Sequence, residues 1–152
     1  MKENKMSITI NAVSENIPVV RVAVTSFISN LEITLDELME IKTAVSEALT
    51  NAIEHGYTKY SGDDPVVILN AKFTSDEEDH VEIEVIDYGI GIEDIELATT
   101  PAYTSKPELE HAGMGFTIME SFMDEIIIDS EKDSGTKITL KKKLRNKKSK
   151  MS

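Results

Sequence analysis

The chain has 152 residues, 40% of them apolar and 29% charged, which is the composition of one ordinary globular domain. No apolar run approaches the ~18 residues of a membrane span, and no apolar segment follows the first lysines, so neither a span nor a secretory signal is expected. Cysteine is absent, which excludes disulfides and cysteine metal sites and is typical of a reducing, cytoplasmic environment.

The net charge of −12 is unevenly distributed along the chain. Seven of the 16 basic residues lie in the last twelve positions, whereas all 28 acidic residues precede them. An acidic body argues against a nucleic-acid-binding surface, because phosphate contacts need clustered cations. We therefore expect one domain over residues 1–143 and a basic, disordered tail over residues 144–152.

The first part of the chain predicts a strand followed by two helices. Residues 6–13 alternate as in a strand, and residues 14–31 carry a helical apolar pattern. Thr34 with Glu37 three residues later forms a capping-box pattern at the start of a long helix, which we expect to end at Gly56. The apolar stripe of this helix comprises Leu38, Ile41, Val45, Ala48, Leu49 and Ala52.

Four later segments alternate between apolar and polar residues and are predicted to be strands. They are residues 66–73 and 81–86, and a closing hairpin of residues 125–130 and 137–143 around Gly135. The predicted fold is α+β, a two-layer α/β sandwich in which helices cover one face of a mixed, mostly antiparallel sheet.

A segment without periodicity interrupts this pattern. Residues 93–112 contain two prolines, and an irregular segment of this length inside a compact domain is usually a functional lid or disordered. A short helix is predicted to follow over residues 116–123.

The first motif suited to chemistry is the pair Glu47 and Asn51. They are four residues apart on the predicted long helix and therefore share a face, beside the small Ala44 and Ala48. A carboxylate can act as a base, and an amide oxygen suits Mg²⁺ when a nucleotide supplies the other oxygen ligands. Alone, such a pair most often lies on a solvated helix surface.

Two glycine motifs follow. The sequence DYGIGI at residues 87–92 comes directly after a strand; Asp87 is placed to accept a hydrogen bond, and Gly89 and Gly91 allow a close backbone approach to a ligand. The sequence GMGF at residues 113–116 opens the predicted short helix, whose free N–H groups suit an anion. The spacings of the dinucleotide fingerprint and the Walker loop, and the protein-kinase motifs, do not occur.

In this order, SEALTNAIEHGY, DYGIGI and GMGF resemble the N box and the two glycine boxes of the GHKL superfamily, which includes gyrase, heat-shock chaperones, histidine kinases and mismatch-repair ATPases. Within it, IKTAVSEALTNAIEHGY and TSKPELEHAGMGFTIMESFMDE resemble the sporulation anti-sigma-F factors. The resemblance implies a homodimer that binds ATP or ADP with Mg²⁺, inhibits sigma-F and phosphorylates a serine of an anti-anti-sigma partner. The acidic body and the lack of a long apolar run predict no direct contact with nucleic acid or a membrane.

The resemblance also implies roles for individual residues. Glu47 would be the general base, Asn51 the Mg²⁺ ligand, and Asp87 the contact to the adenine amino group. The other implied nucleotide-binding residues lie in the glycine boxes, the lid and the last hairpin: Gly89, Gly91, Thr104, Ser105, Lys106, His111, Gly113, Met114, Gly115, Phe116 and Thr136.

His111 departs from the family pattern, in which arginine is usual. An arginine is always charged and holds phosphate with a rigid fork, whereas a histidine is partly neutral at pH 7. Arg21, the only arginine before Arg145, lies among valines of the first predicted helix. It is either a surface ion pair or a contact shared by the sigma factor and its antagonist.

Other functions fit parts of the sequence less well than a kinase does. A histidine-kinase domain needs an upstream phosphoacceptor histidine, and the first 54 residues contain none. A gyrase-like ATPase needs a further domain, for which no chain is left. A third hypothesis is a module that binds sigma factor and uses the nucleotide only as a structural ligand. The presence of Glu47 argues against this hypothesis, whereas His111 in place of arginine leaves it open. An anti-sigma kinase of the stress type fits the residues around Gly113 less well.

Overall fold

The computed structural model describes residues 2–57, 64–92 and 111–145, with the side chains of the last range described from residue 115 onward. In chain order the elements are β1 (Lys2–Asn11), a 3-10 turn η1 (Ser14–Asn16), α1 (Ile17–Ile28), α2 (Leu35–Thr50), a π-helical segment η2 (Asn51–Gly56), β2 (Val66–Ser75), β3 (Asp79–Asp87), α4 (His111–Phe122), β4 (Glu125–Glu131) and β5 (Gly135–Lys143). Most of the predicted lid, and the chain beyond Arg145, lie outside the described residues.

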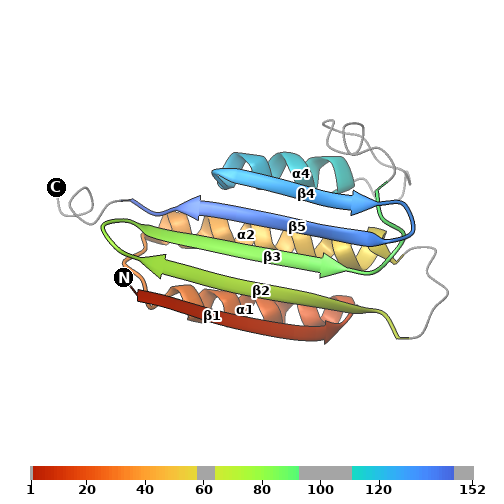
Figure 1. The fold of residues 1–152 in the computed structure, drawn as a ribbon, viewed down its shortest axis with the longest axis horizontal. Coiled ribbons are helices and arrows are strands. Elements are labelled where there is room, and N and C mark those ends of the chain that lie inside the picture. The colour runs from red at the N-terminus through yellow and green to blue at the C-terminus, as the bar shows by residue number, and fades with distance from the viewer. Residues whose placement is uncertain (1, 58–63, 93–110, 146–152) are drawn as a thin grey trace.

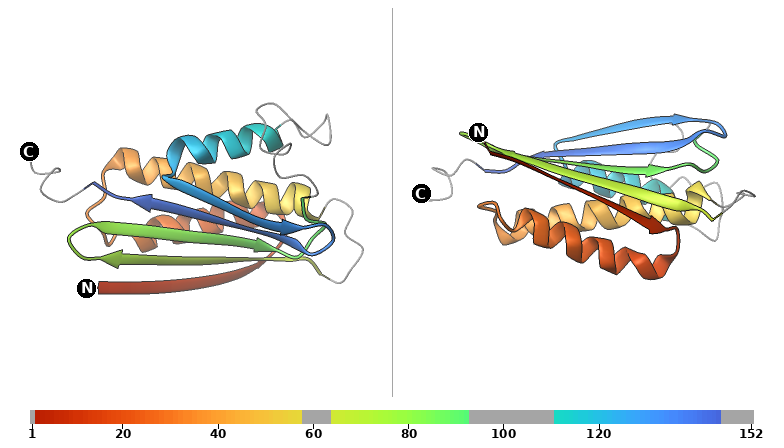
Figure 2. Two further views of the ribbon diagram at one scale, coloured as in Figure 1. Left: turned by 45° about the horizontal axis from the view of Figure 1, so that its top comes forward. Right: turned by 60° about the horizontal axis from the view of Figure 1, so that its bottom comes forward.

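The strands form one sheet in the order β1-β2-β3-β5-β4, and all four pairings are antiparallel. The described helices lie on one face of this sheet and leave the other face open (Figures 1 and 2). The predicted α+β sandwich is therefore confirmed. Alternation along the strands explains it, because each strand presents every second side chain to the helices.

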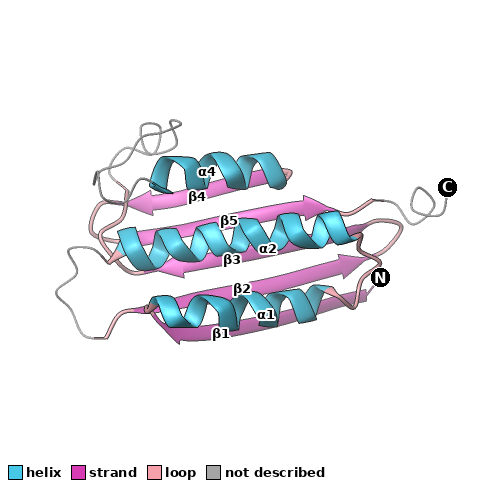
Figure 3. Ribbon diagram, turned by 180° about the vertical axis from the view of Figure 1, so that it is seen from behind, coloured by secondary structure: helices cyan, strands magenta, loops and turns pink. Residues whose placement is uncertain are grey.

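Helix α2 lies in the centre of the helical layer, between α1 and α4 (Figure 3). Its apolar stripe is buried as predicted, since Ile41, Val45, Ala48 and Leu49 are fully inaccessible to solvent. Burial of one such large side chain stabilises the fold by roughly 1.5–3 kcal/mol. The face of α2 that borders this stripe carries the polar residues of interest.

The capping box at the start of α2 is confirmed. The Thr34 hydroxyl accepts a hydrogen bond from the Glu37 N–H at 3.1 Å, and the Glu37 carboxylate accepts one from the Thr34 N–H at 3.0 Å. The second carboxylate oxygen of the buried Glu37 accepts a hydrogen bond from the Arg145 N–H at 2.9 Å. Leu144 is also buried, so the chain remains attached to the domain as far as Arg145.

Two element boundaries differ most from the sequence-based expectation. Strand β1 begins at Lys2, although its first four residues are all polar and show no apolar alternation. Helix α4 begins at His111, so Gly113 and Gly115 lie inside the helix and the prediction that it starts at Phe116 was wrong. Because glycine has a low helix propensity, the sequence pattern did not indicate the first turn of α4.

Candidate functional site

The loop that follows β3 is fixed to the end of η2 by backbone hydrogen bonds. The Ile90 N–H donates to the Gly56 carbonyl at 2.7 Å. The Tyr88 N–H donates to the Tyr57 hydroxyl at 2.7 Å, and that hydroxyl donates to the Val66 carbonyl at 2.6 Å. Tyr57 thus connects the end of the helical segment, the start of β2 and the glycine loop.

The opposite side of the same loop is fixed to the β4–β5 hairpin. The Asp133 N–H donates to the Ile90 carbonyl at 2.6 Å, and the Ile92 N–H donates to the Ser130 hydroxyl at 2.7 Å. Gly91 has φ of 74°, and a Cβ there would overlap the Glu131 carbonyl. Only glycine satisfies both conditions, which explains one glycine of the DYGIGI motif.

Asp87 lies at the centre of this arrangement and is 3% exposed. Burial raises the pKa of its carboxyl group to about 6, against the opposing effect of hydrogen bonds from the backbone of Gly89 and Thr136. The Gly89 N–H donates to Oδ1 at 3.0 Å. A Cβ on Gly56 would come within 2.9 Å of the same carboxyl group, so glycine leaves the space that Asp87 fills.

A second carboxylate faces the other glycine motif. Helices α2 and α4 are adjacent, and a Cβ on Gly115 would come 3.2 Å from Oε2 of Glu47. Glu47 is half-buried. Glu47 and Gly56 are separated by nine residues of α2 and η2, which is roughly 10–14 Å of helix. The two carboxylates therefore lie near opposite ends of the segment Glu47–Gly56, which we call the strip.

Asn51 is the residue at which α2 changes to the π-helix η2. Its N–H is shared between the carbonyls of Glu47 and Ala48, and the wider turn continues to Gly56. Such π-helical turns are frequent at functional sites. Asn51 is half-buried and offers one oxygen, which fits Mg²⁺ that takes its other ligands from phosphates and water. Within the described residues no group of three histidine, cysteine, aspartate or glutamate side chains could hold a metal.

The remaining candidates fall into three groups. Thr136 is buried opposite Asp87 in the β3–β5 pairing. Phe116 is buried in the hydrophobic core, so its side chain contributes to packing. His111, Gly113 and Met114 lie in the first turn of α4, where side chains are not described, and Thr104, Ser105 and Lys106 lie outside the described residues.

Sequence reasoning missed three residues that shape the site: Gly56, Tyr57 and Ser130. Gly56 and Tyr57 directly follow the Glu47–Asn51 motif, and this proximity was the available signal. Ser130 carried no signal, because its contact to Ile92 depends on how the hairpin and the loop meet in space.

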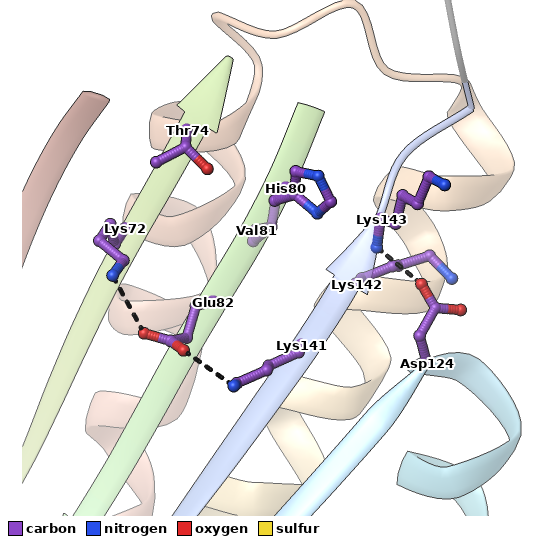
Figure 4. A pocket seen from close by; sticks show the side chains of 9 residues that line it. All are labelled: Lys72, Thr74, His80, Val81, Glu82, Asp124, Lys141, Lys142 and Lys143. Atoms are coloured by element: carbon purple, nitrogen blue, oxygen red, sulfur yellow. Dashed lines mark hydrogen bonds and ion pairs between the residues drawn. The ribbon is translucent and has the colours of Figure 1, made fainter. Parts of the chain in front are cut away.

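A shallow pocket of about 280 Å³ lies elsewhere, on the open face of the sheet (Figure 4). Within it, Glu82 forms partly exposed ion pairs with Lys72 at 3.5 Å and with Lys141 at 3.6 Å, and such surface pairs contribute little to stability. His80, which also lines it, is seven residues from Asp87 along β3, or roughly 23 Å. This pocket is separate from the candidate site.

No helix among residues 2–57, 64–92 and 111–145 is long and apolar enough to cross a membrane. Solved structures share the fold. One, which contains RsbU and RsbW domains from Mycobacterium tuberculosis, matches with a TM-score of 0.66 at 22% identity over 93% of this chain and 32% of that chain. A histidine kinase domain from Erythrobacter litoralis matches with a TM-score of 0.52 at 16% identity over 89% of this chain and 62% of that chain.

Sequence comparison identifies closer relatives. Residues 10–142 match the histidine kinase-like ATPase domain family. The anti-sigma F factor of Clostridium beijerinckii is 52% identical over 94% of this chain and 96% of its own length. Those of Clostridium perfringens and Priestia megaterium are 54% and 51% identical, over 93% and 96% of this chain and 98% and 97% of their own lengths. The chain therefore belongs to the histidine kinase-like ATPase domain family and, within it, to the anti-sigma F factors.

Proposed function

We propose that this protein binds ATP at the strip between Asp87 and Glu47, inhibits sigma-F, and phosphorylates a serine of an anti-anti-sigma antagonist in the cytoplasm. The observation that carries the proposal is the position of the Glu47 carboxylate against Gly115 in the first turns of α4. A base there lies beside the helix end that suits a phosphate group. The names of the relatives support sigma-F as the inhibited factor.

Base recognition is assigned to the Asp87 end of the strip. The buried carboxyl group is held by the Gly89 N–H, and it can accept a hydrogen bond from the adenine amino group. The surrounding loop is fixed on both sides, to η2 and to the β4–β5 hairpin, so little order remains to be gained when the nucleotide binds.

Phosphoryl transfer is assigned to the Glu47 end. Glu47 accepts the proton of the attacking serine hydroxyl, and the N–H groups of the first turn of α4 stabilise phosphate oxygens. Mg²⁺, held by Asn51, would neutralise the charge of the phosphates. Lys106 and His111 complete the proposed phosphate contacts, together with Thr104 and Ser105.

Partner binding is assigned to α1. Arg21 is half-buried on this helix, and its neighbours Val19 and Val22 are 60% and 68% exposed. A charged group beside exposed apolar side chains suits a protein interface, where arginine is enriched at binding hot spots. Sigma-F and the antagonist would compete for this surface on a homodimer.

The test combines the protein with ATP labelled in the γ-phosphate, Mg²⁺ and a candidate antagonist. We expect label on one serine of the antagonist and none without Mg²⁺. ATP binding without any transfer would instead favour the alternative, a sigma-binding module that uses the nucleotide only structurally. If a His111→Arg variant then transfers phosphate, the absence of transfer in the wild-type protein is due to histidine in place of arginine at residue 111.

A further inference from the structure

Ser130 on β4 makes three hydrogen-bond contacts through one hydroxyl group. Its Oγ accepts from the Ile92 N–H at 2.7 Å and donates to the Gly135 carbonyl at 3.0 Å. It also lies 2.8 Å from the Thr136 hydroxyl oxygen, and the distance does not show which of the two hydroxyl groups donates. Ser130 therefore links the glycine loop to both strands of the closing hairpin.

The direction of the third bond follows from where the single Ser130 proton lies. A serine hydroxyl has one proton and two lone pairs. The proton is directed to the Gly135 carbonyl, and one lone pair accepts from Ile92. In this arrangement Thr136 donates its proton to Ser130, which leaves only lone pairs on the Thr136 hydroxyl for other partners; a Ser130 proton directed to Thr136 would give the opposite arrangement.

Thr136 is placed to influence what binds beside Asp87. The two residues are opposite each other in the antiparallel β3–β5 pairing, and Ser130 is opposite Thr136 in the β4–β5 pairing. Directly opposite residues project to the same face, so Asp87, Thr136 and Ser130 form one row beneath the helices. Both Asp87 and Thr136 are buried at this end of the sheet.

We propose that Ser130 is a positioning residue that sets base selectivity, by fixing Thr136 as a hydrogen-bond acceptor and holding the glycine loop at Ile92. This inference rests on the proposed nucleotide site. An acceptor beside the Asp87 carboxylate favours a base that presents an amino group and disfavours one that presents a carbonyl oxygen at the same position. The selected ligand class is adenine nucleotides over hypoxanthine nucleotides.

The experiment compares the affinities for ATP and for inosine triphosphate, whose base carries a carbonyl oxygen in place of the amino group and a hydrogen on the neighbouring ring nitrogen. In Ser130→Ala the Thr136 proton is released and can turn towards the ligand. We expect the ratio of the two affinities to fall by roughly 5- to 10-fold, the weight of one hydrogen bond. Ser130→Thr retains the hydroxyl and should restore the ratio.

Ser75→Ala is the matched control, because it removes another half-buried strand hydroxyl, hydrogen-bonded to Asp79 at 2.6 Å at the far end of the sheet. It should leave the ratio unchanged. If Ser130→Ala weakens both nucleotides equally and lowers the melting temperature, Ser130 is only structural and the inference is wrong. If the wild-type protein binds neither nucleotide, the proposed function itself fails.

Discussion

Glu47 is the residue on which the kinase assignment depends. Glu47→Gln keeps the shape of the side chain beside Gly115 but removes the base. We expect phosphorylation of the antagonist to slow by ~10²–10⁴-fold, while ATP and sigma-F binding persist. Single-turnover kinetics with pre-bound ATP would measure the effect. Transfer at the wild-type rate would remove Glu47 from the mechanism.

Asp87 should make nucleotide affinity depend on pH. Its carboxyl pKa is raised to about 6 by burial, so the free protein holds a proton there below that pH. An amino donor on the base favours the charged form and lowers the pKa on binding. Affinity should therefore rise as pH increases from about 5 to about 6.5 and then level off.

Asp87→Asn is the control for this profile, because it retains an acceptor oxygen for the Gly89 N–H but cannot titrate. Its affinity should be lower at pH 7.5 and flat across the same range. Calorimetric titrations at several pH values would measure both proteins. Parallel profiles would show that another group, and not Asp87, titrates with binding.

At the scale of the element, Gly115 in α4 combines two opposing effects. Gly115→Ala should favour the helix by up to ~1 kcal/mol of unfolding free energy. Its Cβ would lie 3.2 Å from Oε2 of Glu47, so the carboxylate must move. We expect phosphoryl transfer to fall by ~10-fold or more without loss of stability.

Ser121→Ala, which changes an exposed residue of the same helix, should alter neither transfer nor stability. Urea unfolding would measure the stability of both variants, and kinase assays would measure their rates of phosphoryl transfer. A Gly115→Ala protein with full activity would show that Glu47 does not need its observed position.

The capping box of α2 predicts a difference between its two members. Thr34→Ala should lower the free energy of unfolding by about 1 kcal/mol. Glu37→Gln has only one acceptor oxygen, so it cannot serve both the Thr34 and Arg145 N–H groups, and a buried donor left unpaired costs about 1–3 kcal/mol. Urea denaturation would measure both. An equal or smaller loss in Glu37→Gln would show that its contact to Arg145 contributes little.

Local patterns predicted most elements because their causes are local. The Thr34 and Glu37 pair specified the start of α2, and alternation specified β2 and β3. The start of α4 was not predictable in this way, since two glycines in its first turns weaken the helical signal and the contact with α2 compensates.

At the scale of the whole molecule, the strand order β1-β2-β3-β5-β4 could not be read from periodicity, which says nothing about pairing partners. That order places the hairpin containing Ser130 beside the loop of Asp87, and it is why sequence reasoning found Asp87 but missed Ser130. The position of Glu47 against Gly115 likewise depends on the packing of α2 on α4.

In the proposed function, one ATP site supports both the inhibition of sigma-F and the phosphorylation of its antagonist. The most direct measurement is the time course of sigma-F-dependent transcription after a limited amount of antagonist is added to the inhibited complex with ATP and Mg²⁺. Transcription should rise and then fall as the antagonist becomes phosphorylated, whereas with Glu47→Gln it should rise and remain high. Identical time courses for the two proteins would contradict the account.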